Sequence, residues 1–357
     1  MNNFLKRDIA EIFEDKNIPW DRFRNTSVLI TGATGMLPIY MLWMLIYLNE
    51  YHHYNITIYA VVRDSERAKK VLGGYSGEGY LHVIVQDVSV PIHIDAPIQY
   101  IIHAASQASP KYYSSDPVGT INANVLGTVN TLNLARHQKD FRGYLYFSSA
   151  DIYGIVPPEH IPFKETDYGY IDLLNVRSCY CESKRMGEQL CVAYWQQYGI
   201  PTHMIRIFHT YGPYMRLDDR RAFADFVRNV VNNEDIILKT DGTTQRTFCY
   251  VADAVRAYFL VLLCGEIGLA YNVANTKECV SIRQLAETLV SAFPEKGLHV
   301  RIVKDPTDTV TTKMDNPVKV AIPDCTRINE LGWDAHITIA GGFRRTIESI
   351  ESGLIEK

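Results

Sequence analysis

The sequence predicts an α/β protein in which a Rossmann-like, doubly wound parallel sheet is followed by a smaller C-terminal α/β lobe. Two observations predict this fold class. Short β-rich runs alternate with longer helical stretches through the first part of the 357-residue chain, and this alternation is typical of parallel strands joined by crossover helices. After about Tyr211 the elements become isolated and irregularly spaced, which indicates a separate lobe.

The predicted elements follow one another along the chain, beginning with an amphipathic helix over residues 2–15. The strands of the sheet are expected at residues 27–31, 56–62, 81–85, 100–103, 144–147 and 202–207. The helices that cross over it are expected at residues 36–50, 65–72, 118–137 and 180–198. The lobe is expected to contain helices at 223–232, 251–263, 281–293 and from 339 onward, and a strand at 236–240.

These elements divide the chain into three parts. An N-terminal helical extension covers residues 1–26, the sheet domain covers residues 27–210, and the lobe covers residues 211–357, part of which can return to the sheet. Within the lobe, residues 305–323 are rich in Asp, Thr and Pro and are expected to form a long loop.

Composition and charge argue against several classes of function. A formal charge of −4 without a basic run gives no electrostatic footprint for nucleic acid. The seven cysteines are scattered and lack C-x-x-C spacing, which favours reduced thiols in the cytoplasm, and no metal site is expected. The N-terminal residues lack the apolar core of a signal peptide, and the most apolar run, residues 36–48, is too short for a membrane span. That run is therefore expected to be a helix buried against the sheet.

A glycine-containing turn follows the first expected strand. Residues 31–35 read Thr-Gly-Ala-Thr-Gly, and the apolar helix follows directly. Glycines allow backbone N–H groups to approach a pyrophosphate at a helix N-terminus. Gly32, Gly35, Thr34 and Met36 are therefore candidate contacts for a dinucleotide, and the alternative is an ordinary strand-to-helix turn.

Two charged residues, Arg63 and Asp64, follow the second expected strand, where a Rossmann fold contacts the adenosine ribose. A carboxylate there binds the ribose hydroxyls of NAD, whereas an arginine can bind the extra phosphate of NADP. Asp87, after the third expected strand, is a candidate for the adenine amino group. The alternatives are a solvated strand-end charge for Arg63 and a turn residue for Asp87.

A tyrosine and a lysine stand four residues apart at Tyr180 and Lys184, within the helix expected over residues 180–198. The two side chains share a helix face, where the lysine charge is expected to lower the pKa of the phenol toward working pH. A tyrosine with a lowered pKa can act as an acid and a base. Together, the glycine turn and this pair suggest an enzyme that moves a hydride.

Several further segments carry a resemblance to a known family. They are His103-Ala104-Ala105-Ser106, Asn124-Val125-Leu126-Gly127-Thr128, Phe147-Ser148-Ser149, Asp151-Ile152-Tyr153-Gly154, Arg206-x-Phe208-x-x-Tyr211-Gly212-Pro213 and residues 241–251. With these segments in this order, the chain from about Ser27 resembles the extended short-chain dehydrogenase/reductases that act on sugar nucleotides, namely the NAD-dependent epimerases, dehydratases and decarboxylases. Ser109-Pro110-x-Tyr112, Asp116-Pro117-Val118 and Gly332-Trp333 make the UDP-glucuronate decarboxylases the most similar subfamily.

The resemblance implies a mechanism. Tyr180 takes the proton of the sugar 4-hydroxyl as the C4 hydride passes to the nicotinamide, Ser149 hydrogen-bonds the same oxygen, and Lys184 binds the nicotinamide ribose. The resemblance implies further cofactor contacts at Ala104, Ser106 and Asn124.

The sequence departs from the family pattern at four positions. The Asp-Glu pair with which a 4,6-dehydratase eliminates water is Ala150 and Asp151 here, which argues against that reaction. Asp151 is either a catalytic carboxylate or a turn residue. The third glycine of the cofactor turn is Pro38, which predicts looser or shifted cofactor binding. The asparagine that contacts the sugar or phosphate is His209, which is either a neutral hydrogen-bond donor, a cation for an anionic substrate, or a buried structural histidine.

Two arginines are candidate substrate ligands. Arg246 matches the family arginine that grips the diphosphate, a contact suited to a forked guanidinium. Arg177 is expected to pair either with a substrate carboxylate or with a local acid such as Glu182. Lys319 is an approximate counterpart of a family nucleotide-binding arginine.

Three functional hypotheses follow. The first is decarboxylation of a UDP-uronic acid through transient C4 oxidation by NAD, with NADP as an option because of Arg63. The second is 4-epimerisation of a sugar nucleotide. The third is a catalytically silent nucleotide-binding protein, suggested by Pro38, Ala150 and His209. The resemblance also implies a homodimer formed through the helices at 118–137 and 180–198.

Overall fold

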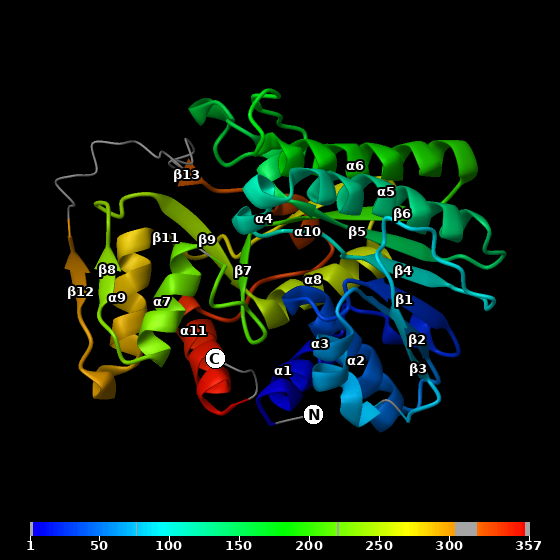
Figure 1. Ribbon diagram of the computed structural model, residues 1–357, viewed down its shortest axis with the longest axis horizontal. Helices are drawn as coiled ribbons and strands as arrows, with labels where there is room; N and C mark the ends of the chain where they lie inside the picture. Colours follow the sequence, from blue (N-terminus) through cyan, green and yellow to red (C-terminus); the bar gives the residue numbers. More distant parts are fainter. Residues whose placement is uncertain (1–2, 76, 220, 304–319, 354–357) are drawn as a thin grey trace.

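Seven parallel strands form the main sheet of the computed structural model, which describes residues 3–75, 77–219, 221–303 and 320–353 (Figure 1). Their order is β10-β6-β5-β4-β1-β2-β3. Their bounds are β1 (Ser27–Thr31), β2 (Thr57–Val62), β3 (Leu81–Val85), β4 (Tyr100–His103), β5 (Gly143–Ser149), β6 (Thr202–Ile207) and β10 (Ala270–Val273). The strand order reverses between β1 and β4, so the predicted doubly wound fold is confirmed.

Helices cover both faces of this sheet (Figure 1). On one face, α5 (Pro117–Arg136) and α6 (Ser178–Tyr198) lie side by side, preceded by the short α4 (Pro110–Ser115). The other face carries α2 (Met36–His52), α3 (Ser65–Leu72) and α8 (Val251–Cys264). Strands covered on both faces are apolar throughout rather than alternating, and every residue of β4 and β5 is buried.

The apolar run near the first strand forms α2, and nearly all of its residues from Pro38 to Leu48 are buried. It packs against α8, α1, β1 and β2. A helix that is apolar on all sides needs such cover on all sides. Within the described ranges, no helix combines the length and the apolar character that a membrane crossing requires.

The chain beyond residue 211 returns to the main sheet. β10 pairs with β6, and α8 packs against β5 and β6. The helix over 251–263 was expected in the lobe, with part of the chain after residue 211 allowed to return to the sheet; the helix in fact packs on the sheet, so its expected place in the lobe is wrong. The physical reason is that every residue of α8 from Val251 to Leu263 is buried, so the helix is sandwiched between the sheet and its neighbours.

The smaller lobe contains two short sheets. β9 (Gln245–Tyr250) pairs with β7 (His209–Tyr211), β11 (Cys279–Ser281) and β13 (Val320–Ala321), and β8 (Ile236–Leu238) pairs with β12 (Val300–Ile302). The helices beside them are α7 (Ala222–Val231), α9 (Ile282–Ala292) and α11 (Ile339–Glu351), and the short α10 (Thr326–Asn329) contacts β10 (Figure 1). Most of the loop expected over 305–323 lies outside the described residues, and its last part contains β13.

The predicted N-terminal helix is α1 (Asn3–Phe13), and it links the sheet domain to the lobe. Its Asp8 carboxylate is buried and accepts hydrogen bonds from Tyr40 Oη of α2 at 3.1 Å and Tyr250 Oη of β9 at 2.5 Å. Arg345 of α11 pairs with the same carboxylate at 3.0 Å. Burial raises the pKa of Asp8, and the tyrosine and arginine contacts act against this rise.

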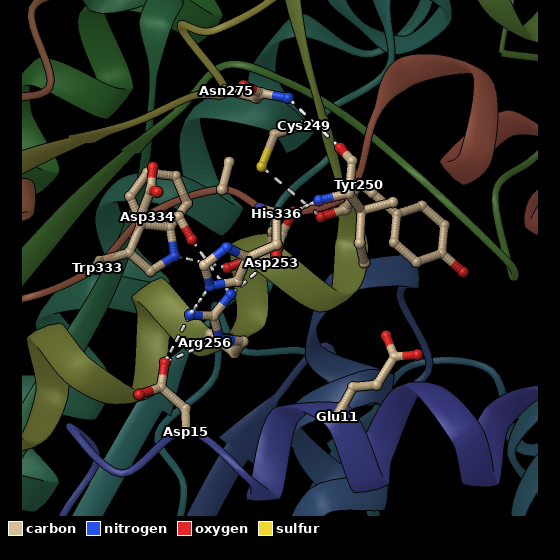
Figure 2. Close-up of polar contacts among 12 residues, drawn as sticks. Glu11, Asp15, Cys249, Tyr250, Asp253, Arg256, Asn275, Trp333, Asp334 and His336 are labelled. Atoms are coloured by element: carbon tan, nitrogen blue, oxygen red, sulfur yellow. Dashed lines mark hydrogen bonds and ion pairs between the residues drawn. The ribbon is translucent and has the colours of Figure 1, made fainter.

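A second buried network, centred on Arg256 of α8, holds both ends of the chain (Figure 2). The guanidinium contacts the carboxylates of Asp15 at 2.7 Å and Asp253 at 3.0 Å and lies 3.1 Å from Nε2 of His336. Trp333 Nε1 donates to the Asp253 carbonyl at 2.9 Å. The segment after α1 and the segment before α11 are therefore fixed to the same helix.

Candidate active site

The carboxyl ends of β1, β4 and β5 meet at one edge of the sheet, because all three strands are parallel. Thr31, the last residue of β1, organises this edge. Its hydroxyl accepts hydrogen bonds from the backbone N–H groups of Ala104 at 3.2 Å and Ala105 at 3.1 Å and lies 2.8 Å from His103 Nδ1. The family-like segment at 103–106 is thereby held against the start of the glycine turn.

The glycine turn has the close backbone approach that its sequence predicts. Gly32 has a φ of +65°, and a Cβ there would lie 2.9 Å from Cα of Ala105. The N–H of Gly35 donates to the Gly32 carbonyl at 2.8 Å, and Met36 then begins α2. Pro38 lies in the first turn of that helix, where backbone N–H groups have no intrahelical partner. The turn is therefore compatible with proline at this position.

Two buried polar atoms without partners fit a dinucleotide cofactor. Among the described residues, Ser106 Oγ and Asn124 Oδ1 are buried without a hydrogen-bond partner. The amide nitrogen of Asn124 is fixed by Ser183 Oγ at 2.8 Å. Buried polar atoms of this kind need partners, and the hydroxyls and phosphates of NAD can supply them. The predicted cofactor residues are thus compatible with NAD.

The two candidates for the adenosine end of the cofactor differ in their surroundings. Arg63 is exposed directly after β2. Asp87 Oδ1 accepts a hydrogen bond from the backbone N–H of Ser89 at 2.8 Å. This bond is typical of a turn residue, which was the alternative to an adenine contact for Asp87. Its role with adenine stays a prediction.

Tyr180 lies in the first turn of α6 and is buried. The side chain of Ser149, the last residue of β5, lies near this hydroxyl and lowers the pKa of the phenol. The ring of Tyr113 from α4 stacks on the Tyr180 ring, with centroids 4.6 Å apart and planes inclined by 17°. The Ser149–Tyr180 pair expected from the resemblance is therefore assembled, and Tyr113 limits how the phenol can move.

Lys184 lies one helical turn further along α6, but its ammonium does not act on Tyr180 as expected. Nζ donates to the Phe147 carbonyl at 2.7 Å and is 5.8 Å from the centre of the Tyr180 ring. Burial lowers the pKa of Lys184 to about 7. Burial raises the pKa of Tyr180, as does Asp151, while Ser149 and Arg221 lower it. The predicted lowering of the tyrosine pKa is wrong for this arrangement, because desolvation of the phenol is the largest effect.

Asp151 lies beside these groups in a short 3₁₀ helix, Ala150–Tyr153. Its side chain is partly open to solvent. The surrounding protein nevertheless desolvates the carboxylate, and this desolvation raises its pKa. Three arginines act in the opposite direction, in the order Arg221, Arg177 and Arg246. The two arginines that the sequence nominated as substrate ligands are therefore gathered near one carboxylate, next to Tyr180.

Arg221 is a site residue that the sequence reasoning missed. It pairs with Asp219, which also accepts a hydrogen bond from Ser109 Oγ at 3.1 Å. Its charge lowers the pKa values of both Tyr180 and Asp151. The only signal in the sequence is that Arg221 directly precedes α7 in a charged segment that follows the Tyr-Gly-Pro motif, and this does not distinguish it from a surface arginine.

The other two arginines have distinct surroundings. Arg246 on β9 is buried, and its Nη1 donates to the Gln245 carbonyl at 2.7 Å. Burial lowers its pKa. The local pair of Arg177 with Glu182, one of the alternatives for this arginine, is not formed in the described residues, and Glu182 pairs with Arg185 at 3.2 Å instead. The approximate counterpart Lys319 lies outside the described residues.

His209 lies on β7 beside the aromatic rings of Phe223 and Phe248, whose centroids are 6.3 Å and 5.5 Å from its own. Burial lowers its pKa to about 3, and Arg246 and Arg221 contribute to the same shift. The imidazole is therefore neutral at working pH, so His209 does not serve as a cation for an anionic substrate. Its Nδ1 is buried without a partner among the described residues, so it can still hydrogen-bond a ligand.

The fold recurs in solved structures of sugar-nucleotide enzymes. UDP-N-acetylglucosamine 4-epimerase from Methanobrevibacter ruminantium matches with a TM-score of 0.75 at 18% identity, over 92% of this chain and 99% of that one. UDP-glucuronic acid 4-epimerase from Bacillus cereus, solved in complex with NAD, matches with a TM-score of 0.72 at 19% identity, also over 92% and 99% of the two chains.

Sequence comparison identifies the family. UDP-glucuronic acid decarboxylase 3 from Arabidopsis thaliana is 31% identical over 89% of this chain and 87% of that protein. UDP-glucuronic acid decarboxylase 1 from Xenopus tropicalis is 29% identical over 78% of this chain and 62% of that protein. The profile of a family of NAD dependent enzymes matches residues 28–274, in agreement with the expected cofactor. The chain therefore belongs to the NAD dependent epimerase/dehydratase family.

Proposed function

We propose that this enzyme decarboxylates a UDP-linked uronic acid through transient oxidation at C4 of the sugar. The observation that carries the proposal is that Arg221, Arg177 and Arg246 all lie close enough to Asp151 to lower its pKa, and that Asp151 in turn acts on Tyr180. A UDP-uronic acid carries a diphosphate and a carboxylate, and guanidinium groups bind both kinds of anion well. The similarity to UDP-glucuronic acid decarboxylases supports the same substrate class.

The residues divide the chemistry as follows. NAD, held by residues that include Ser106, Asn124 and Lys184, would supply the acceptor for the C4 hydride and the donor for its return. Tyr180 removes the proton of the 4-hydroxyl, and Ser149 orients that oxygen through a hydrogen bond. We assign Lys184 to the cofactor ribose, Arg246 to the diphosphate and Arg177 to the sugar carboxylate.

With C4 at the ketone level, the C5 carboxylate is that of a β-keto acid. The C5–C6 bond breaks, carbon dioxide leaves, and the electron pair of the bond forms an enolate. The enolate oxygen accepts hydrogen bonds from Ser149 and Tyr180. C5 then takes up a proton, for which we nominate Asp151, because the raised pKa of this carboxyl favours its protonated form.

A 4-epimerase is the second candidate, because rotation of the ketone and hydride return to the other face need only Ser149, Tyr180 and Lys184. The structural similarity to a UDP-glucuronic acid 4-epimerase favours it specifically. The silent-protein hypothesis is not supported, because the chain belongs to an enzyme family and the Ser149–Tyr180 pair is assembled.

Incubation of the purified protein with NAD and UDP-glucuronate, followed by mass spectrometry, separates the two candidates. We expect the product to have lost one carbon dioxide. An isobaric product with a new chromatographic retention time would instead establish the epimerase. Arg177→Gln is expected to slow carbon dioxide release by about tenfold or more, since one charge-assisted contact is lost. Arg283→Gln, which changes an exposed arginine of α9, is the control.

We further propose a homodimer formed through α5 and α6. Exposed apolar side chains lie on this pair of adjacent helices, namely Val118, Ile121 and Leu126 on α5 and Met186 on α6. Apolar side chains clustered on a surface mark an interaction site. We also propose a cytoplasmic location, which the seven free cysteines support.

A double substitution tests the dimer. Ile121→Glu together with Met186→Glu should weaken self-association by about tenfold or more, because the charges would be buried at the interface. The measurement is size-exclusion chromatography with light scattering over a range of concentrations. Ile302→Glu in β12, where the isoleucine is also exposed, should leave the dimer intact. A monomeric wild-type protein would contradict the proposal.

A further inference from the structure

A cavity of about 180 Å³ lies at the amino ends of three strands of the main sheet. Tyr100 is the first residue of β4, Arg142 directly precedes β5, and His203 is the second residue of β6. The last turn of α8 and the segment that follows it complete the walls, together with Arg22 of the 3₁₀ helix Trp20–Phe23. The candidate catalytic residues gather at the carboxyl ends of the strands, so the cavity is separate from the active site.

Two guanidinium groups converge on one phenol in this cavity. Tyr100 is almost fully buried, and its Oη donates to the backbone carbonyl of Arg22 at 3.3 Å. Burial raises the pKa of Tyr100, whereas the charges of Arg142 and Arg22 lower it. Both cations therefore lie close to the same phenol oxygen, and the cavity that they line gives them a common space.

Protein acids do not balance the positive charge of this cavity. Asp140 pairs with Arg142 at 2.8 Å and raises the pKa of that guanidinium. Among the residues that the structure describes, no carboxylate lies within ion-pair distance of Arg22. Burial lowers the pKa of His203 to about 4, so its imidazole is neutral and adds no charge. The cavity therefore keeps a net positive charge, which an anionic ligand would balance.

Arg22 also has a structural contact at the end of α8. Its Nη1 donates to the carbonyl of Leu263, in the last turn of the helix, where a cation offsets the negative end of the helix dipole. A guanidinium has several N–H donors, and the side chain of Arg22 donates no other hydrogen bond within the described ranges. Its remaining donors are available to a ligand.

The size and the walls of the cavity limit the ligand. A volume of about 180 Å³ is below the roughly 300 Å³ at which pockets for drug-sized ligands begin, which excludes a whole nucleotide sugar. The walls combine the two arginines with the apolar side chains of Pro201, Leu262 and Ile267. Apolar walls lower the local dielectric constant and strengthen the attraction between a guanidinium and an anion. A small oxyanion meets these limits, because its oxygens can accept two parallel N–H groups of an arginine.

We propose that this cavity is a second anion site of the protein, in which Arg22 and Arg142 bind a phosphate ion or a short phosphate monoester. The strand β9, which carries Arg246, ends where α8 begins, whereas the cavity lies at the other end of α8. Occupation of the cavity therefore leaves the active site open. The proposal does not depend on which reaction the active site performs.

Calorimetric titration with inorganic phosphate tests the site. The titrations are made at constant ionic strength and with saturating NADH and UDP, so that the arginines of the active site are already engaged. We expect one phosphate to bind per chain, and we expect Arg22→Gln, Arg142→Gln and the double variant each to lose about tenfold or more in affinity, since charge-assisted hydrogen bonds are lost. Arg301→Gln, which alters an exposed arginine of β12, is the charge-matched control and should bind phosphate as the wild-type protein does.

A second probe distinguishes the two forms of the ligand. Tighter binding of glycerol 3-phosphate than of inorganic phosphate would assign the cavity to a monoester, and weaker binding would assign it to the free ion. Retained NADH binding shows that each variant is folded. Arg142→Gln leaves the contact at the end of α8 untouched, so it decides the result if Arg22→Gln does not fold. Failure of the wild-type protein to bind phosphate under these conditions, or equal affinities in the wild-type protein and the variants, would overturn the proposal.

Discussion

Tyr180→Phe is expected to reduce turnover by at least about a hundredfold while leaving the fold and cofactor binding intact. The substitution removes only the hydroxyl, and a positioned acid/base contributes on the order of a hundredfold or more. The ring can still stack on Tyr113, whose centroid lies 4.6 Å away. Turnover is measured as product formed from UDP-glucuronate, or from the sugar nucleotide that the mass spectrometry identifies.

Two comparisons make this result specific. Tyr198→Phe removes a hydroxyl from the far end of the same helix, where the ring lies under Arg136 at 4.0 Å, and it should retain normal activity. The affinity of Tyr180→Phe for NADH should match that of the wild-type protein, because the lost hydroxyl acts on the sugar. Near-normal activity of Tyr180→Phe would refute the role of this tyrosine as the acid and base.

The same tyrosine shows what the sequence could and could not predict about the site. The spacing of Tyr180 and Lys184 predicts one helix face, and α6 places both residues there. Their pKa values depend on burial, which spacing does not contain. The phenol is desolvated, and the lysine is engaged by the Phe147 carbonyl. The four-residue spacing therefore predicted where the pair lies, whereas tertiary packing determined the pKa values of the two side chains.

A similar division holds for the fold. The strands of the first half were predicted because each is a run of apolar, often β-branched residues next to a turn, and β1, β3, β4 and β6 begin and end where expected. β10 (Ala270–Val273) was missed because it is four residues long and contains an asparagine. Its partner β6 precedes it by more than sixty residues, so no local pattern reveals the pairing. Arg221 was missed for the same reason, since only the folded chain brings it to Tyr180 and Asp151.

A buried ion pair behind the active site should have the largest effect on stability. Arg206 of β6 is almost fully buried, and its guanidinium contacts both carboxylate oxygens of Glu188 on α6, at 2.9 Å and 2.7 Å. It also donates to Tyr153 Oη at 2.9 Å and to the Glu165 carbonyl at 2.6 Å. These contacts tie α6, which carries Tyr180, to the sheet.

Arg206→Met is expected to destabilise the protein by about 3–5 kcal/mol, measured by urea unfolding, because it leaves the Glu188 carboxylate buried without its cation. Most of the lost stability comes from leaving the Glu188 carboxylate buried and unpaired, and less of it from the lost contacts of Arg206. The double variant Arg206→Met/Glu188→Leu should therefore recover a large part of the stability, since an apolar pair can replace a buried ion pair at little net cost. If the losses in unfolding free energy from the two single substitutions instead added up in the double variant, Arg206 and Glu188 would contribute through packing alone. The hydrogen bonds between them would then not be what holds α6, and with it Tyr180, against β6.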